Sequence, residues 1–309
     1  PQEAQREVRG YMGRAGDGRG RRLAGCVGEQ GEHAALHGSQ AVHHVGGERE
    51  LERSRARVEH ALDHHCVVPR HTHHADHARV AQRLQQVLDD WNFLAPQLED
   101  LYQTLNSGKA RHAFPFDPKL CMAPLPRAYQ WADGSAYLNH VELVRASRKS
   151  VVPESFYKDP LMYQGGSDDF VGPCDPVICP DEAFGIDFEA EIAVITGDVP
   201  MGVSPENALD GIRLVMIAND VSLRNLIPNE LAKGFGFVQS KPATAFSPVA
   251  VTLDEFGDAW DHGRVHLSMQ STWNGRKVGM CDAGPEMTFH FGQLIAHIGK
   301  TRNVRAGSI

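Results

Sequence analysis

Residues 186–194 alternate apolar and acidic side chains, a pattern that a β-strand separates onto two faces. One face is apolar and the other carries three carboxylates, Asp187, Glu189 and Glu191. Carboxylates about 7 Å apart on one face repel each other by about 2 kcal/mol at an effective dielectric constant near 20. The acidic face therefore requires water, a bound cation or protonation. A solvated outer face of a sheet and a metal site are both open interpretations of this segment.

The composition is that of a globular protein and argues against several classes of binding protein. The chain has 309 residues, of which 41% are hydrophobic and 23% charged, enough for one large domain or two ordinary ones. A formal net charge of -8 argues against binding to nucleic acids and against binding to acidic membrane surfaces. No apolar run reaches the length of a membrane span. Scattered cysteines without a Cys-x-x-Cys pair, and no recognisable signal peptide, predict a cytoplasmic setting.

The first 79 residues differ in composition from the rest of the chain. Residues 1–80 hold 12 Arg, 11 Gly and 11 of the 17 His, and they contain no Lys, Ile, Phe, Trp or Asn. Many arginines beside few large apolar residues favour disorder, and a bias toward residues with G/C-rich codons suggests translation in a wrong frame. We therefore predict that residues 1–79 are disordered or mistranslated. The alternative is a transition-metal site built from His64, His65, Cys66, His71, His73, His74 and His77.

From residue 80 onward the pattern is that of an ordinary folded protein. Apolar residues at steps of three and four, beginning at Leu84, predict an amphipathic helix that stops near Pro96. A second helix and a proline-rich linker complete a partial helical region over residues 80–126. Residues 127–309 contain short strand-like runs, a hairpin turn at Asn274-Gly275 and a helix over residues 289–298. We predict an α+β, mostly β domain for these residues.

Two further segments carry candidate functional residues. Asp220 follows an apolar run at residues 214–218, and an acid at the end of a buried strand serves either as a metal ligand or as a helix N-cap. Arg224 lies four residues further on, a spacing that also suits simple pairing with Asp220 along a helix. His140 shares a helical face with Tyr137 and Val141, so an ordinary half-buried histidine is an alternative to a catalytic one.

Taken together, these segments resemble the fumarylacetoacetate hydrolase family over about residues 120–309. The resemblance lies in the order and spacing of an Asp seven residues before a His, an acid-x-acid strand, a later strand-end Asp and a following Lys. It implies the family's mixed β-sandwich roll fold for residues 127–309 and a homodimer. It also assigns roles: the metal ligands are Asp133, Glu189, Glu191 and Asp220, the catalytic residues are His140 as general base, Arg224 and Lys241, and the substrate-binding residues are Tyr163, Arg224 and Lys241.

The resemblance implies a hydrolase that cleaves a carbon–carbon bond in a fumarylacetoacetate-like or acylpyruvate-type diketo acid, within aromatic-compound breakdown. Hydratases, isomerases and oxaloacetate decarboxylases of the family remain alternatives. Ser135 and Ile227 stand where fumarylacetoacetases usually carry Tyr and Gln, so the exact diketo acid stays open. A site made only of carboxylates favours Mg²⁺ or Ca²⁺, with Mn²⁺ as a substitute.

The end of the chain also departs from the family pattern. The chain stops at Ile309, at the start of what resembles the family's terminal strand. The resemblance therefore predicts a C-terminally truncated catalytic domain, and an inactive product is a further alternative to an active enzyme.

Overall fold

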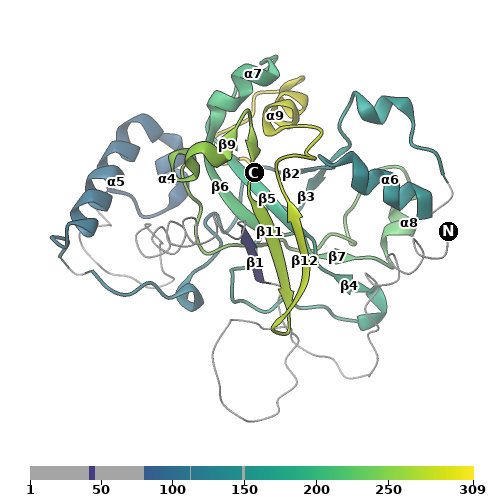
Figure 1. Ribbon diagram of the computed structural model, residues 1–309, viewed down its shortest axis with the longest axis horizontal. Coiled ribbons are helices and arrows are strands. Elements are labelled where there is room, and N and C mark those ends of the chain that lie inside the picture. The colour runs from purple at the N-terminus through teal and green to yellow at the C-terminus, as the bar shows by residue number, and fades with distance from the viewer. Residues whose placement is uncertain (1–41, 46–79, 112, 148–149) are drawn as a thin grey trace, which may run out of the picture.

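The computed structural model describes residues 42–45, 80–111, 113–147 and 150–309. The predictions made for residues 1–79 lie outside these ranges, apart from Val42–Val45, whose backbone forms strand β1. Within the described ranges, small antiparallel sheets are surrounded by short helices, which confirms the α+β, mostly β fold class (Figure 1). No helix in these ranges is long and apolar enough to cross a membrane.

The central sheet has the strand order β5-β6-β8 and is antiparallel. Its strands are β5 (Ala190–Thr196), β6 (Ile212–Asn219) and β8 (Ala245–Phe246). Val194 and Val215 pack into one hydrophobic cluster together with helix α9 (Phe291–Gly299), whereas Ile195 and Leu214 pack into a second cluster. Because successive side chains point to opposite faces, this sheet is covered on both sides and forms the core that supports the site.

Four smaller sheets surround the central one in the described part of the chain. They pair β2 (Trp131–Gly134) with β3 (Met162–Gly165), β4 (Ile186–Asp187) with β7 (Ser222–Leu223), β9 (Trp260–Asp261) with β10 (Arg264–Val265), and β11 (Ser268–Trp273) with β1 and with β12 (Arg276–Asp282). The predicted turn at Asn274-Gly275 joins β11 to β12, and its φ angles are 51° and 73°. A two-residue hairpin loop requires these left-handed conformations.

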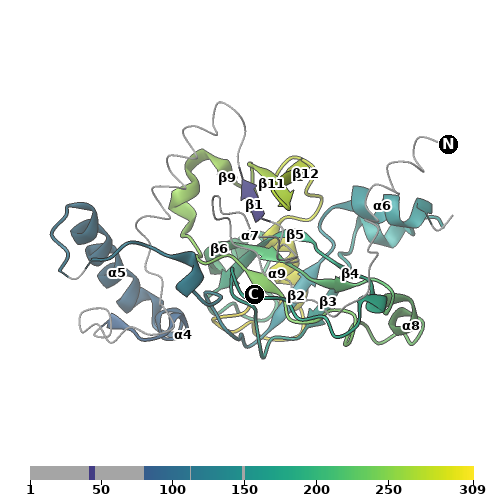
Figure 2. The ribbon, with the colours of Figure 1, turned by 90° about the horizontal axis from the view of Figure 1, so that it is seen from below.

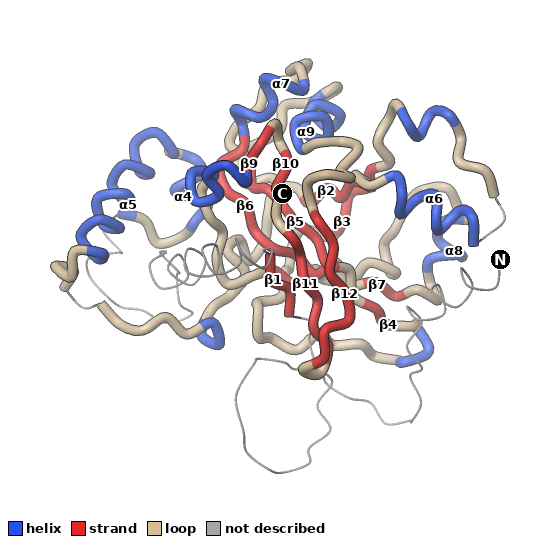
Figure 3. The backbone as a smooth tube through the Cα atoms, in the orientation of Figure 1, coloured by secondary structure: helices blue, strands red, loops and turns tan. Residues whose placement is uncertain are grey.

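The remaining helices lie at the two ends of the strand region. Helices α4 (Leu84–Asp89) and α5 (Trp91–Asn106) lie on one side, and α6 (Leu138–Ser147) and α8 (Ile227–Leu231) lie on the other, while α7 (Pro205–Ala208) packs beside α9 (Figures 2 and 3). The predicted helix over residues 289–298 is confirmed as α9, which begins two residues later.

The prediction that the first helix stops near Pro96 is wrong. The helical pattern breaks earlier, at Asp90, and α5 continues through Pro96 to Asn106. Proline removes one backbone hydrogen bond, the one to the carbonyl four residues before it. That carbonyl belongs to Asn92, which is exposed and therefore accessible to solvent. An exposed helix tolerates this loss better than a buried one.

Residues 186–194, called the acidic segment below, form two strands with an interruption at Phe188 and Glu189. Its first part, β4, pairs with β7, and its second part, β5, pairs with β6. At the interruption, Asp187 Oδ1 accepts a hydrogen bond from the Phe188 N–H at 2.9 Å, and Asn219 Oδ1 accepts one from the Glu189 N–H at 3.2 Å. The prediction of one continuous strand is therefore wrong, because the two parts pair with different partners.

Candidate metal centre

Four carboxylates converge where β5 begins and β6 ends. Antiparallel pairing places Ala190, the first residue of β5, opposite Asn219, the last residue of β6. The Asp220 N–H also donates a hydrogen bond to the Glu189 carbonyl at 3.0 Å, which holds the backbones of these two acids together. A fourth acid comes from β2. Each of these residues offers one oxygen within 4.8 Å of the others, and they are the four predicted ligands, Asp133, Glu189, Glu191 and Asp220.

Asp220 is the most deeply buried carboxylate of this cluster, with no exposed surface. Its Oδ2 accepts hydrogen bonds from the Tyr163 hydroxyl at 2.6 Å and from the Lys241 ammonium at 2.7 Å. Its Oδ1 accepts one from the Thr244 hydroxyl at 3.0 Å. A buried carboxylate without partners is costly, so these three donors hold its oxygens in fixed directions. The prediction that Asp220 caps a helix is not met, since β7 follows it.

Two cationic side chains bind different oxygens of Glu189. Lys241 Nζ lies 2.8 Å from Glu189 Oε2, and the side chain of Lys241 is only 8% exposed. Arg224 Nη1 lies 2.6 Å from Glu189 Oε1, and Arg224 Nε lies 2.9 Å from Asp187 Oδ2. Arg224 therefore bridges two acids of the acidic segment. The predicted alternative, a helical pair between Arg224 and Asp220, is wrong, because Arg224 follows a strand.

The carboxyls of the cluster differ in pKa according to their neighbours. Burial raises the pKa of Glu189, but the ion pairs with Lys241 and Arg224 outweigh burial and hold this pKa below its usual value. Burial, followed by the charges of Asp133 and Asp220, raises the pKa of Glu191 well above its usual value. Burial and the charge of Asp220 raise the pKa of Asp133 to about 7. Without a further cation, these two carboxyls keep their protons to higher pH than an ordinary carboxyl does.

The predicted base, His140, lies on α6 beside this cluster. Its side chain is exposed rather than half-buried, while the neighbouring Val141 is buried. Desolvation lowers the pKa of His140; Glu189 acts against this, and Arg224 and Lys241 lower the pKa further. The contributions of these three charges indicate that the imidazole lies near the acids and cations of the site. At neutral pH it is uncharged and able to accept a proton.

Tyr163, a predicted substrate-binding residue, packs against the cluster. It lies on β3 opposite Asp133 of β2. Its ring meets the Phe237 ring edge-on, with centroids 4.8 Å apart, and Lys241 Nζ lies 5.6 Å from its centroid. The structure thus brings all eight predicted site residues to one region, where Arg224 and Lys241 bind carboxylates of the acidic segment and Lys241 also binds Asp220.

The donor set suits a hard divalent cation. All four side chains offer carboxylate oxygens, which Mg²⁺ and Ca²⁺ prefer. Two of the four, Asp133 and Glu191, have raised pKa values because they are buried and lie beside other acids. A cation among them would remove that repulsion. The residues present therefore fit a divalent metal ion.

Sequence reasoning missed three contacts around this cluster. Thr244 donates to Asp220, Asp187 holds Arg224, and Glu230 binds the chain just before Lys241. The alternating pattern of the acidic segment identifies Asp187 as one of its acids, but it does not predict that Asp187 pairs with Arg224. No local pattern marks Thr244 or Glu230, because their contacts depend on how separate segments meet.

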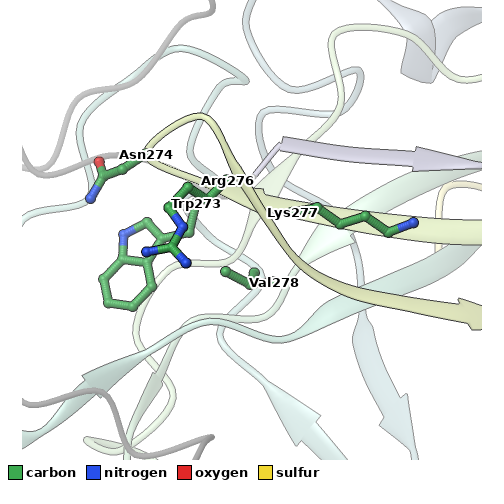
Figure 4. Close-up of a pocket in the computed structure, with 5 residues that line it drawn as sticks. All are labelled: Trp273, Asn274, Arg276, Lys277 and Val278. Atoms are coloured by element: carbon green, nitrogen blue, oxygen red, sulfur yellow. The ribbon is translucent and has the colours of Figure 1, made fainter.

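A pocket of about 330 Å³ lies at the tip of the β11–β12 hairpin (Figure 4). Its lining is Trp273, Asn274, Arg276, Lys277 and Val278, and it includes none of the four carboxylates. Trp273 meets the Phe188 ring, with centroids 6.3 Å apart. The hairpin tip therefore touches the acidic segment at the place where that segment changes sheet.

Known protein families match almost all of the described chain. The profile of the fumarylacetoacetate (FAA) hydrolase C-terminal domain matches residues 130–309. The profile of fumarylacetoacetase N-terminal domain 2 matches residues 62–127. The first match includes every residue of the candidate site.

Similarity to individual proteins is moderate. A 2,4-didehydro-3-deoxy-L-rhamnonate hydrolase from Sphingomonas sp. (strain SKA58) is 29% identical over 154 residues, covering 49% of this chain and 51% of the relative. A mitochondrial oxaloacetate tautomerase from Xenopus laevis is 27% identical over 155 residues, covering 49% and 46%. The chain spans about half the length of these curated relatives.

A solved structure shares the fold. It is that of an HpcE-designated protein from Mycobacterium smegmatis, with a TM-score of 0.52, 21% identity and coverage of 72% of each chain.

Proposed function

Since this chain belongs to the fumarylacetoacetate hydrolase family, we propose that it is a divalent-metal-dependent hydrolase acting on a carbon–carbon bond. The proposed substrate is a fumarylacetoacetate-like or acylpyruvate-type diketo acid, and the proposed ion is Mg²⁺ or Ca²⁺, with Mn²⁺ as a substitute. Water adds to one carbonyl carbon, and the bond between this carbon and its neighbour breaks. The electron pair of the broken bond stays on the neighbouring carbon, which then takes up a proton to complete the second product. The reaction yields two acids.

One observation supports this proposal above the others: four carboxylates converge beside two cationic side chains. Only one carboxylate of the four, Glu189, contacts both cations. The uncompensated charge of Asp133 and Glu191 is what a divalent ion would offset. When bound, the ion would polarise a substrate carbonyl and stabilise the negative charge that develops in the reaction.

The side chains around the ligands divide the remaining work. His140, uncharged and next to the cluster, takes the proton from the attacking water. Arg224 carries a planar guanidinium that binds a carboxylate through two hydrogen bonds, and its 39% exposed side chain is open to an incoming substrate acid. Lys241 supplies positive charge deeper in the site, and Tyr163 holds Asp220 in place.

An absorbance assay tests the proposal directly. Loss of an acylpyruvate is followed while Mg²⁺ is titrated into the metal-free chain, and the products are separated by chromatography. We expect saturable, EDTA-reversible turnover that yields two acids, and loss of this turnover in Glu191→Gln. A folded chain that binds Mg²⁺ but leaves every diketo acid intact would falsify the proposal.

A second candidate is a keto–enol tautomerase or isomerase of a short keto acid. The similarity to the oxaloacetate tautomerase from Xenopus laevis favours it. Such a reaction moves one proton between carbon and oxygen, so it needs a base and a cation but no attacking water. The enol absorbance of oxaloacetate is followed with and without the protein. A faster decay with the protein, without formation of acid fragments or CO₂, would support this candidate over the hydrolase.

A further inference from the structure

Glu230 is a buried carboxylate that the proposed reaction does not use. It lies near the end of α8, and only 7% of its surface is exposed. The N–H groups of three successive residues donate to it: Val238 at 3.1 Å, Gln239 at 2.7 Å and Ser240 at 3.0 Å. The Ser240 hydroxyl donates to the same carboxylate. Burial raises the pKa of Glu230, but these hydrogen bonds outweigh burial and lower the pKa to about 2, so the group is an anion at neutral pH.

The loop between Glu230 and this binding point has little packing of its own. Phe235 is 99% exposed and Val238 is 82% exposed. Gly234 and Gly236 have φ angles of 79° and 105°, which only glycine adopts readily. The carboxylate of Glu230 therefore anchors the end of a loop in which the Phe235 and Val238 side chains do not pack.

The anchored backbone leads directly into the site. Lys241 is the next residue, and its ammonium bridges Glu189 and Asp220 at 2.8 Å and 2.7 Å. On the other side of the anchor, Phe237 packs edge-on against Tyr163, which donates to Asp220. The backbone that Glu230 binds thus lies between two side chains that contact the metal-ligand cluster. A second fixed point is the Leu223 N–H, which donates to the Ser240 carbonyl at 2.8 Å.

We propose that Glu230 is a positioning residue: by binding three successive backbone N–H groups, it fixes the chain before Lys241 and so holds the Lys241 ammonium between Glu189 and Asp220. An acid placed on a short helix thereby sets the position of a cation that it does not touch. The positioning itself follows from the contacts. Its effect on substrate binding rests on the proposed function, in which Lys241 faces the diketo acid.

Lysine reactivity tests the positioning without any assay of activity. The full chain and Glu230→Gln are treated with an amine-reactive reagent, and modification of each lysine is followed by mass spectrometry. A glutamine keeps the size of the side chain but directs an amide NH₂ at N–H donors. We expect Lys241 to react about tenfold faster, since loss of hydrogen bonds to a charged group makes local opening about that much more frequent. The exposed Lys158 should keep its rate, which shows that reagent concentration and pH are the same in both samples.

Two further variants make the result decisive. Glu286→Gln, the same change at an exposed acid, should leave Lys241 protected. Ser240→Ala removes only the hydroxyl donor and should speed modification of Lys241 about threefold, and it decides the matter if Glu230→Gln yields no folded protein. Unchanged reactivity of Lys241 in the folded variant overturns the proposal.

Kinetics separate this proposal from the proposed function. In Glu230→Gln we expect the KM for the diketo acid to rise about tenfold, while Mg²⁺ affinity measured by calorimetry stays within about twofold, because the four carboxylates are unchanged. Faster modification of Lys241 with an unaltered KM would support the positioning role and remove Lys241 from substrate binding. An unaltered rate of modification would overturn the positioning role, whatever the activity.

Discussion

The two glutamates of the acidic segment lie two residues apart and differ in their electrostatic surroundings. Glu189 forms ion pairs with Arg224 and Lys241, and its pKa is lowered despite burial. For Glu191, burial and neighbouring acids raise the pKa, and within the described residues no ion pair reaches it or Asp133. We call Asp187, Glu189 and Arg224 the outer group, and Asp133, Glu191 and Asp220 the inner group. Arg224 and Lys241 offset the negative charge of the outer group, whereas protons or an added cation would offset that of the inner group.

This difference indicates how one short segment can serve two purposes. In the proposed function, acids with cationic partners orient those partners toward the substrate. The acids without such partners hold the metal ion together with Glu189. Asp220 belongs to the inner group but also binds Lys241, so it links the two.

The largest effect is expected from Asp220→Ala. Removing this buried carboxylate deletes a predicted ligand and leaves the Tyr163 and Thr244 hydroxyls without their acceptor. We expect Mg²⁺ affinity to fall by more than about 100-fold, because even residues that only support metal ligands are worth about 10- to 100-fold. Calorimetry with Mg²⁺ measures the affinity, and Asp210→Ala, a change at an exposed acid before β6, is the control. Full activity that resists EDTA in Asp220→Ala would remove Asp220 from the site.

A second prediction separates the base from the ligands. His140→Ala should retain Mg²⁺ affinity, because the imidazole is not one of the converging groups. Turnover should fall about 100-fold or more, which is the usual contribution of a positioned general base. Calorimetry and initial rates on the same preparation measure both quantities. Lost metal affinity would instead make His140 a ligand and extend the inner group to α6.

The sequence predicts those parts of the site that depend on local spacing. The acid-x-acid pattern places Glu189 and Glu191 together, and the strand-end position of Asp220 brings it to the same edge. The partners of Arg224 are not predictable in this way, because they depend on β4 pairing with β7 across more than thirty residues. The interruption at Phe188 has the same cause. Glu230 lies on a short helix whose sequence does not show that three later N–H groups will converge on it.

The third prediction concerns pH and the inner group. Burial and the charge of Asp220 raise the pKa of Asp133 to about 7, and the pKa of Glu191 is also raised. A cation binds the ionised carboxylates, so it must displace these protons, and affinity should increase as pH rises through 7. For each proton displaced, Mg²⁺ affinity should change about tenfold per pH unit below the pKa.

Calorimetry at pH 6 and pH 8, in buffers of different ionisation enthalpy, measures both the affinity and the number of protons released. The inner group should release protons, and the outer group should not, since the pKa of Glu189 is lowered. An affinity that is independent of pH over this range would show that the inner acids already have a compensating charge, and the distinction between the groups would be lost.

The smallest effect is expected from Asp187→Asn in the outer group. The Asp187 and Arg224 side chains are 36% and 39% exposed, and ion pairs between such exposed groups are worth up to about 1 kcal/mol. The KM for the diketo acid should rise by no more than about fivefold as Arg224 loses one of its two anchors, and this difference should shrink at high salt. Mg²⁺ affinity should stay within about twofold. Because Asp187 and Glu191 lie on the same segment, a loss of metal affinity in Asp187→Asn comparable to that in Asp220→Ala would mean that the charge of the whole segment holds the ion, rather than the inner acids alone.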